Sequence, residues 1–232
     1  MKNQKLTHII RIQKWLRRLR KPCLYIVCDC SASMTNAWYN GLTNDINTIL
    51  LENKHAYVTV LRFDDRCKII PTHNHTLGFK PIRSSQLTPN GRTALNDACI
   101  QIFKIATEKM KLGHKVKIII YTDGEENASQ KYSNKNFGKE AVTSHVNTLK
   151  KNGVDIIFMG ANQNAEIVGK SMGIDSHLCL SFDVNDKVAR NAAFRSVSRV
   201  VRTSAPFTQM ERQCSLGNDT YTQPIYKKKL KF

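Results

Sequence analysis

Long apolar runs are absent from this chain, and no stretch approaches the roughly 18 residues that a membrane-spanning helix needs. The N-terminal region also lacks the apolar core and cleavage site of a secretory signal. Seven cysteines are present, but they form no CxxC pair, and an odd number argues against a disulfide framework or a zinc site. We therefore expect a reduced, intracellular protein, in the first place cytoplasmic, with a nuclear or organellar location left open.

Signatures of common enzyme classes are missing as well. The chain has no phosphate-binding loop of the Walker type, no dinucleotide fingerprint and no nucleophile elbow. Its sequence also nominates no general base beside the polar clusters described below. We therefore expect a protein that is not an enzyme, and metal-assisted hydrolysis is the weakest alternative.

Acidic residues are scarce, with 18 Asp and Glu against 36 Lys and Arg. Residues 1–21 carry eight basic side chains and no acidic one, and their apolar residues recur at helical spacing. This pattern predicts a basic amphipathic helix over 1–21. Such a helix could pack its apolar stripe on the domain, bind an anionic surface or nucleic acid, or serve as an organelle transit peptide.

The C-terminal part of the chain is basic too. Residues 204–232 end in a run of lysines, and we predict that they form a flexible tail. The preceding segment is predicted to continue a basic face through Arg190, Arg195, Arg199 and Arg202. An anionic partner of the two ends, nucleic acid or another anionic surface, is therefore an alternative function: a nucleic-acid-associated or ribonucleoprotein component.

Short apolar strands alternate with segments of helical periodicity between residues 22 and 203. Several of these strands are apolar on both faces, which is typical of a parallel sheet covered by helices on each side. Residues 67–70 follow a tight turn and are predicted to add one short antiparallel edge strand. The sequence thus predicts one α/β domain over 22–203, a Rossmann-like, doubly wound and mostly parallel sheet with helices on both faces. The expected strands are 23–29, 56–63, 67–70, 116–121, 154–160 and 178–182, and the expected helices are 34–53, 94–110, 138–152, 163–172 and 185–203.

One carboxylate and two hydroxyls follow the first of these strands, as Asp29, Ser31 and Ser33. In an extended backbone alternate side chains point the same way, so these three are expected to converge. Hard oxygen donors without a thiol or imidazole suit Mg²⁺. On its own the pattern is weak, because Ser33 would also serve as the N-cap of the helix expected over 34–53.

Two further oxygen donors are predicted at the same edge of the sheet. Asp123 follows the strand 116–121, and Thr93 lies in a glycine-containing turn that leads into the helix 94–110. In open parallel sheets, ligands bind where loops leave the carboxyl ends of the strands. The five residues therefore form a candidate metal site.

These residues make the chain resemble the von Willebrand factor A family, whose metal-ion-dependent adhesion site reads Asp-x-Ser-x-Ser, then Thr, then Asp. The resemblance covers about residues 22–203 and is strongest to small single-domain members from bacteria, phages and viruses. It is also carried by the runs 91–98, 122–129 and 160–163. Ala32 departs from the family pattern, where glycine usually separates the two serines, but it adds only a methyl group.

The resemblance implies a role for each residue. Ser31, Ser33 and Thr93 would contact Mg²⁺ (or Mn²⁺ or Ca²⁺) directly, and Asp29 and Asp123 would act through bound waters. An open metal position would then capture a Glu or Asp of a partner protein, which makes the domain a metal-dependent adhesion or scaffold module.

Four other polar residues near the site have weaker expectations. Asn127 and Asn162 either flank the bound ligand or are ordinary turn residues. Asp97 is expected to cap its helix or support the site, and Glu126 to be solvated.

Overall fold

A six-stranded sheet forms the centre of the computed structural model, which describes residues 21–74 and 78–217. The strand order is β3-β2-β1-β6-β7-β8, and every neighbouring pair is parallel except β2 with β3. This confirms the prediction of a mostly parallel sheet with one antiparallel edge. The strands are β1 Cys23–Asp29, β2 Tyr57–Phe63, β3 Cys67–Ile70, β6 Val116–Thr122, β7 Asp155–Ala161 and β8 Cys179–Phe182, and a separate small hairpin pairs β4 His73–Asn74 with β5 Gly78–Phe79.

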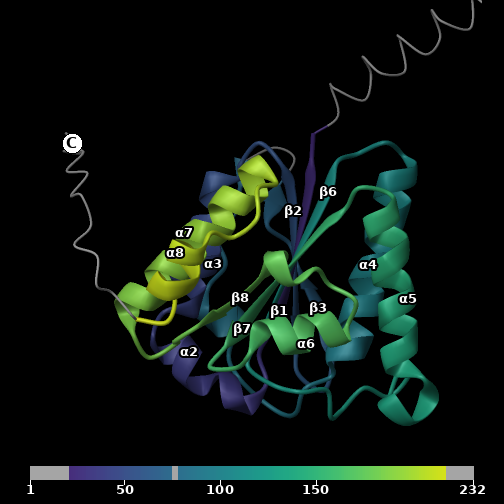
Figure 1. Cartoon of the computed structure of the whole chain (residues 1–232), viewed down its shortest axis with the longest axis horizontal. Coiled ribbons are helices and arrows are strands. Elements are labelled where there is room, and N and C mark those ends of the chain that lie inside the picture. The colour runs from purple at the N-terminus through teal and green to yellow at the C-terminus, as the bar shows by residue number, and fades with distance from the viewer. Residues whose placement is uncertain (1–20, 75–77, 218–232) are drawn as a thin grey trace, which may run out of the picture.

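Helices cover both faces of the sheet, as predicted for a Rossmann-like α/β fold. Figure 1 shows α3 and α7 on one side of the strands and α4 and α5 on the other. No helix within the described ranges has the length and apolar character required to cross a membrane. The helices are α2 Thr35–Tyr39, α3 Leu42–Glu52, α4 Leu95–Lys111, α5 Gly138–Lys151, α6 Ala165–Ser171, α7 Lys187–Thr203 and α8 Gln209–Cys214.

The central strand β1 shows why the sheet needs two layers of helices. All seven of its residues are buried. Leu24 and Ile26 belong to the apolar cluster under α3 and α7, whereas Tyr25 and Val27 belong to the cluster under α4 and α5. Because side chains alternate along a strand, an uninterrupted apolar run demands cover on both faces.

The single helix expected over 34–53 is in fact two helices. Gly41 separates α2 from α3 in the left-handed region, with φ +107°. A glycine reaches this conformation without the steric cost that a Cβ would impose. Ser33 is not an N-cap, because it lies inside a short 3₁₀ helix, Ala32–Met34, and caps no helix with its side chain.

The prediction of a flexible tail from residue 204 is wrong for residues 204–217. The chain turns back after α7 and adds α8, which begins with a capping box between Thr208 and Glu211. Ser215 then bonds to the edge strand β8, where its hydroxyl donates to the carbonyl of Ser181 at 2.7 Å. The segment is thus part of the domain, while residues 218–232 and all but the last residue of the helix predicted over 1–21 lie outside the described residues.

Phe207 anchors this added segment. Its side chain is buried in the cluster under α7, and the guanidinium of Arg212 lies 5.9 Å from its ring centre. We expect Phe207→Ala to lower the free energy of unfolding by about 3 kcal/mol, at the low end for a buried aromatic because the site lies at the margin of the core. Urea denaturation measures this. An unchanged midpoint would show that 204–217 does not contribute to stability, and Met210→Ala, at an exposed site, is the matched control.

Most of the arginines of the last long helix are ion-paired. The prediction of a continuous basic face along α7 is therefore wrong, and of the four arginines only Arg195 is exposed without an ion pair among the described residues. The three pairs are Arg190–Asp45, Arg199–Glu211 and Arg202–Glu52.

Candidate metal centre

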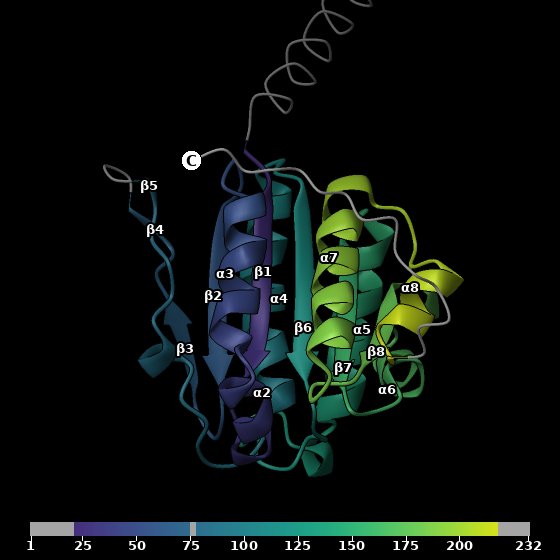
Figure 2. The same cartoon turned by 90° about the vertical axis from the view of Figure 1, so that its left-hand side faces the viewer.

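The candidate residues meet at the carboxyl end of the sheet. In Figure 2 the arrowheads of β1, β2 and β6 point to the same end of the molecule. Asp29 is the last residue of β1, Asp123 follows β6 directly, and Thr93 precedes α4 by two residues. The parallel topology therefore brings together side chains that lie up to 94 positions apart in the sequence.

Asp29 shapes the loop that carries the two serines. Its carboxylate is fully buried and accepts a hydrogen bond from the backbone N–H of Ser31 at 2.8 Å. Its second oxygen accepts one from the hydroxyl of Thr122 at 2.5 Å. The serines thus come together in a turn that the Asp29 carboxylate holds and in the 3₁₀ helix that follows. The extended backbone predicted for residues 29–33 ends at Asp29.

The hydroxyls of the serines reach each other and the second carboxylate. The oxygens of Ser31 and Ser33 are 3.0 Å apart, and Ser33 donates to Asp123 at 2.8 Å. Adjacent ligands of an octahedral Mg²⁺, bound at 2.0–2.1 Å, are separated by about 2.9 Å. The spacing of the two serine hydroxyls therefore fits neighbouring positions around such an ion, and the Asp123 carboxylate lies directly behind one of them.

Thr93 is placed beside them by the loop after β6. Its backbone N–H donates to the side-chain oxygen of Asn127 at 2.9 Å, and its carbonyl accepts from the N–H of Asn127 at 3.0 Å. A Cβ on Gly124 would lie 3.3 Å from the Thr93 hydroxyl and 3.8 Å from that of Ser33. The two hydroxyls thus border one small space that glycine leaves open.

Burial affects both carboxylates. It raises the pKa of Asp29 to about 6, although hydrogen bonds from Thr122 and Ser31 act in the opposite direction. Burial also raises the pKa of Asp123. The described part of the chain places no Lys or Arg beside these two carboxylates, so a cation would stabilise their charged forms.

Two acidic residues, Glu126 and Asp97, hold the loops beside the site, and for Asp97 this is one of the two roles expected from the sequence. Glu126, expected to be solvated, accepts from the N–H of Asn96 in the first turn of α4 at 2.7 Å and from the hydroxyl of Ser129 at 2.6 Å. Asp97 accepts from the N–H of Tyr132 at 2.8 Å and so fixes the loop after β6 rather than capping its own helix. Asn96 and Tyr132 lie 30 and 35 residues away from these carboxylates in sequence, so no local pattern reveals the two contacts.

Similarity to known proteins is found in the fold and not in the sequence. No family model and no curated protein matches the chain. Among solved structures, the vWF domain of the type V pili tip protein Mfa5 from Porphyromonas gingivalis covers 82% of this chain and 97% of its own, with 10% identity and a TM-score of 0.53. Proximal thread matrix protein 1 from the mussel byssus covers 78% of this chain and 46% of its own, with 17% identity and a TM-score of 0.50.

The chain has the von Willebrand factor A fold. At such low identity the likeness concerns the fold, and the chain spans less than half the length of the byssus protein. Within residues 21–74 and 78–217, no group of three or more His, Cys, Asp and Glu side chains could hold a metal. The candidate centre has a different composition, with two carboxylates and three hydroxyls.

The two asparagines each bond to a neighbouring loop at this edge of the sheet. The side-chain oxygen of Asn127 is used by Thr93, as described above. Asn162 has a left-handed φ of +52°, and its side-chain oxygen accepts from the N–H of Val184 at 3.1 Å. Both residues thus fix the loops at this edge, and contact with a ligand stays a prediction.

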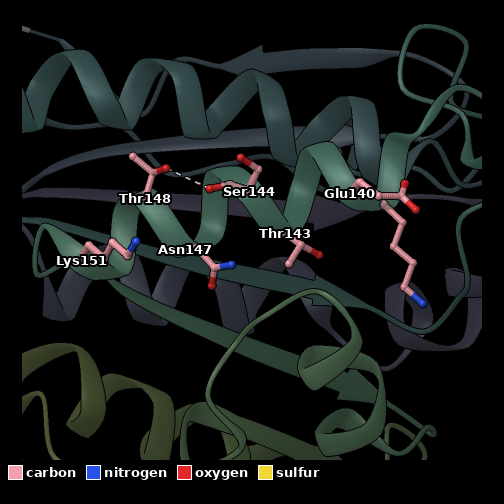
Figure 3. Close-up of a pocket in the computed structure, with 7 residues that line it drawn as sticks. Glu140, Thr143, Ser144, Asn147, Thr148 and Lys151 are labelled. Atoms are coloured by element: carbon pink, nitrogen blue, oxygen red, sulfur yellow. Dashed lines mark hydrogen bonds between the residues drawn. The ribbon is translucent and has the colours of Figure 1, made fainter.

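A shallow hollow of about 560 Å³ lies elsewhere, along the exposed face of α5 (Figure 3). Its lining comes from this one helix, and side chains such as Thr143 and Asn147 are arranged along the helix rather than around a common point. The Thr148 hydroxyl donates back to the carbonyl of Ser144 at 2.9 Å. A ligand would meet only one element here, so we assign no function to this hollow.

Proposed function

We propose that the domain is a metal-dependent protein-binding module. The observation that carries the proposal is the spacing of 3.0 Å between the hydroxyl oxygens of Ser31 and Ser33, which fits adjacent ligands of a small octahedral cation, with the Asp123 carboxylate 2.8 Å behind Ser33. Ser31, Ser33 and Thr93 would hold Mg²⁺, or Mn²⁺ or Ca²⁺, directly, and Asp29 and Asp123 would act largely through water. When bound, the metal would supply a positive charge and an open position for a partner's carboxylate.

The residues of the chain determine what can approach that position. Asp29 holds the serine loop, and Gly124 leaves the space between the hydroxyls of Ser33 and Thr93 open. Beside Gly124 a groove of about 260 Å³ passes Glu125 and reaches Ile167, whose side chain is 68% exposed. We propose that a Glu or Asp of a partner protein enters the metal position while neighbouring residues of that partner lie in this groove.

The proposed role is binding and not catalysis. Among residues 21–74 and 78–217, no lysine or histidine pairs with Asp29 or Asp123, and the hydroxyl of Ser33 already donates to Asp123. A pili tip protein among the similar structures agrees with an interaction module. The alternative, a nucleic-acid partner held by the basic ends, falls mostly on residues 1–20 and 218–232, outside the described residues.

Calorimetry and peptide binding test the proposal. We expect about one Mg²⁺ per chain, and Mg²⁺-dependent binding to a peptide array in which Glu or Asp is exposed. Binding should disappear with EDTA and with the same peptides carrying Gln or Asn. Peptide binding that persists in EDTA would contradict the proposal, as would the absence of any heat of Mg²⁺ binding.

A further inference from the structure

The end of the sheet opposite the metal centre carries a basic surface. It surrounds the amino ends of β1, β2 and β6, which lie together in Figure 2 at the end away from the arrowheads. We call it the amino-end face. This face includes Lys21, Lys54, Tyr57, Lys109, His114 and Lys115.

Acidic residues near this face are already neutralised. Glu52, Glu108 and Asp155 each form an ion pair, with N–O distances of 2.8 to 2.9 Å. By contrast, the described part of the chain offers no ion pair to the exposed lysines Lys54, Lys109 and Lys115. The face therefore presents positive charge that nothing in the described domain compensates.

A recess of about 390 Å³ opens within the face, beneath β1 and β6 and between the ends of α3 and α7. Basic groups line it from several elements, including His55, Lys115 and Arg202. Lys117 also lines it, and its ammonium is fixed by Asp155 at 2.9 Å and the hydroxyl of Ser204 at 2.7 Å. A concave basic wall of this kind fits phosphate groups on a flexible backbone better than a flat bilayer.

An aromatic side chain adjoins the recess. Tyr57 is 41% exposed, its ring lies 5.6 Å from the ammonium of Lys21, and the His114 ring is 6.4 Å away at 70°. His114 is held by a contact of 2.9 Å between its Nδ1 and the carbonyl of Lys21. Exposed aromatic rings among lysines are the groups on which unpaired bases stack.

The recess and the tyrosine belong to one surface. Pro22, Ala56 and Lys115 line the recess, while their chain neighbours Lys21, Tyr57 and His114 form the aromatic cluster. Consecutive side chains at this edge of the sheet thus point to opposite sides. A nucleic-acid strand that crosses the edge could place phosphates in the recess and a base on Tyr57.

We propose that the amino-end face binds single-stranded nucleic acid. Its lysines contact the phosphates, and the ring of Tyr57 stacks on a base. This site lies on the folded domain itself, apart from the basic ends of the chain. It uses no residue of the metal centre, and binding therefore does not require a divalent cation.

Fluorescence anisotropy with a labelled 20-nucleotide oligouridine tests this on the full chain. We expect the triple variant Lys54→Glu, Lys109→Glu, Lys115→Glu to bind at least tenfold more weakly. The slope of log affinity against log salt should fall by about 2, since three phosphate contacts are lost. Tyr57→Ala should weaken binding by about tenfold.

Matched controls separate the face from bulk charge and from the chain ends. Lys139→Glu, Lys170→Glu, Lys187→Glu has the same net charge but alters exposed lysines elsewhere, and Tyr39→Ala removes another exposed tyrosine. Equal losses in test and control variants would overturn the proposal, as would tight binding to phosphatidylserine vesicles with none to the oligonucleotide. The wild type should bind the oligonucleotide in EDTA, and Asp29→Ala should bind it as tightly as the wild type does under the same conditions, so failure here is distinguishable from failure of the metal-dependent function. Circular dichroism checks that each variant is folded.

Discussion

Asp123→Ala is expected to abolish measurable Mg²⁺ binding and, with it, the capture of acidic peptides. The substitution removes the carboxylate that accepts from Ser33 at 2.8 Å, so the Ser33 hydroxyl loses the group that orients it. It also removes one of only two anionic side chains in the set, and hydroxyls alone compensate the charge of a divalent ion poorly. We expect an affinity loss of at least 100-fold, measured by calorimetry with the Mg²⁺ concentration extended to 20-fold above the wild-type dissociation constant.

The matched control for this variant is Glu125→Ala. Glu125 is an exposed carboxylate on the same loop, two residues away, so it contributes to the local negative potential without belonging to the oxygen set. We expect its Mg²⁺ affinity to change by no more than about threefold, the size of a screened surface charge. Equal losses in the two variants would show that general negative potential attracts the ion, and an unchanged affinity in Asp123→Ala would contradict the proposed site.

The sequence predicts the fold well because the signals that determine it are local. Apolar strands such as 23–29 and 116–122 are buried on both faces, and this requires helices on both sides. The meeting of the five candidate residues at one edge of the sheet is also predictable, since they lie at or near the ends of β1 and β6 and the start of α4, while metal binding by them stays a prediction. Their convergence depends on that topology and on a short pattern, both of which a single sequence contains.

Other features depend on contacts that a single sequence does not reveal. The hydrogen bond that Glu126 accepts depends on the backbone of Asn96, which is brought near only by folding. The segment containing α8 has few apolar residues, so its docking through Phe207 does not produce a strong periodic signal. Positive charge misleads in a similar way, because Arg190, Arg199 and Arg202 are basic in the sequence but paired in the fold.

The ion pair between Arg190 and Asp45 gives the largest stability effect that we predict. Both residues are buried, the Arg190 Nε donates to Asp45 at 2.8 Å, and its Nη1 donates to the carbonyl of Val184 at 3.3 Å. Arg190→Leu leaves the carboxylate of Asp45 without its cation in the core between α3 and α7. We expect the free energy of unfolding at pH 7.5 to fall by about 3 to 5 kcal/mol, as measured by urea denaturation.

The pH dependence of this loss and a double variant identify its cause. Burial raises the pKa of Asp45 to about 6 even beside Arg190, so removing the guanidinium raises that pKa further. Below pH 6 the isolated carboxyl is then neutral and costs less to bury, so the difference between wild type and Arg190→Leu should shrink at pH 5. Replacing both partners by leucine removes the buried charge altogether, and we expect this double variant to recover most of the loss at pH 7.5. If the single and double variants were equally destabilised at both pH values, the cost would come from lost packing around Arg190 and not from an unpaired charge.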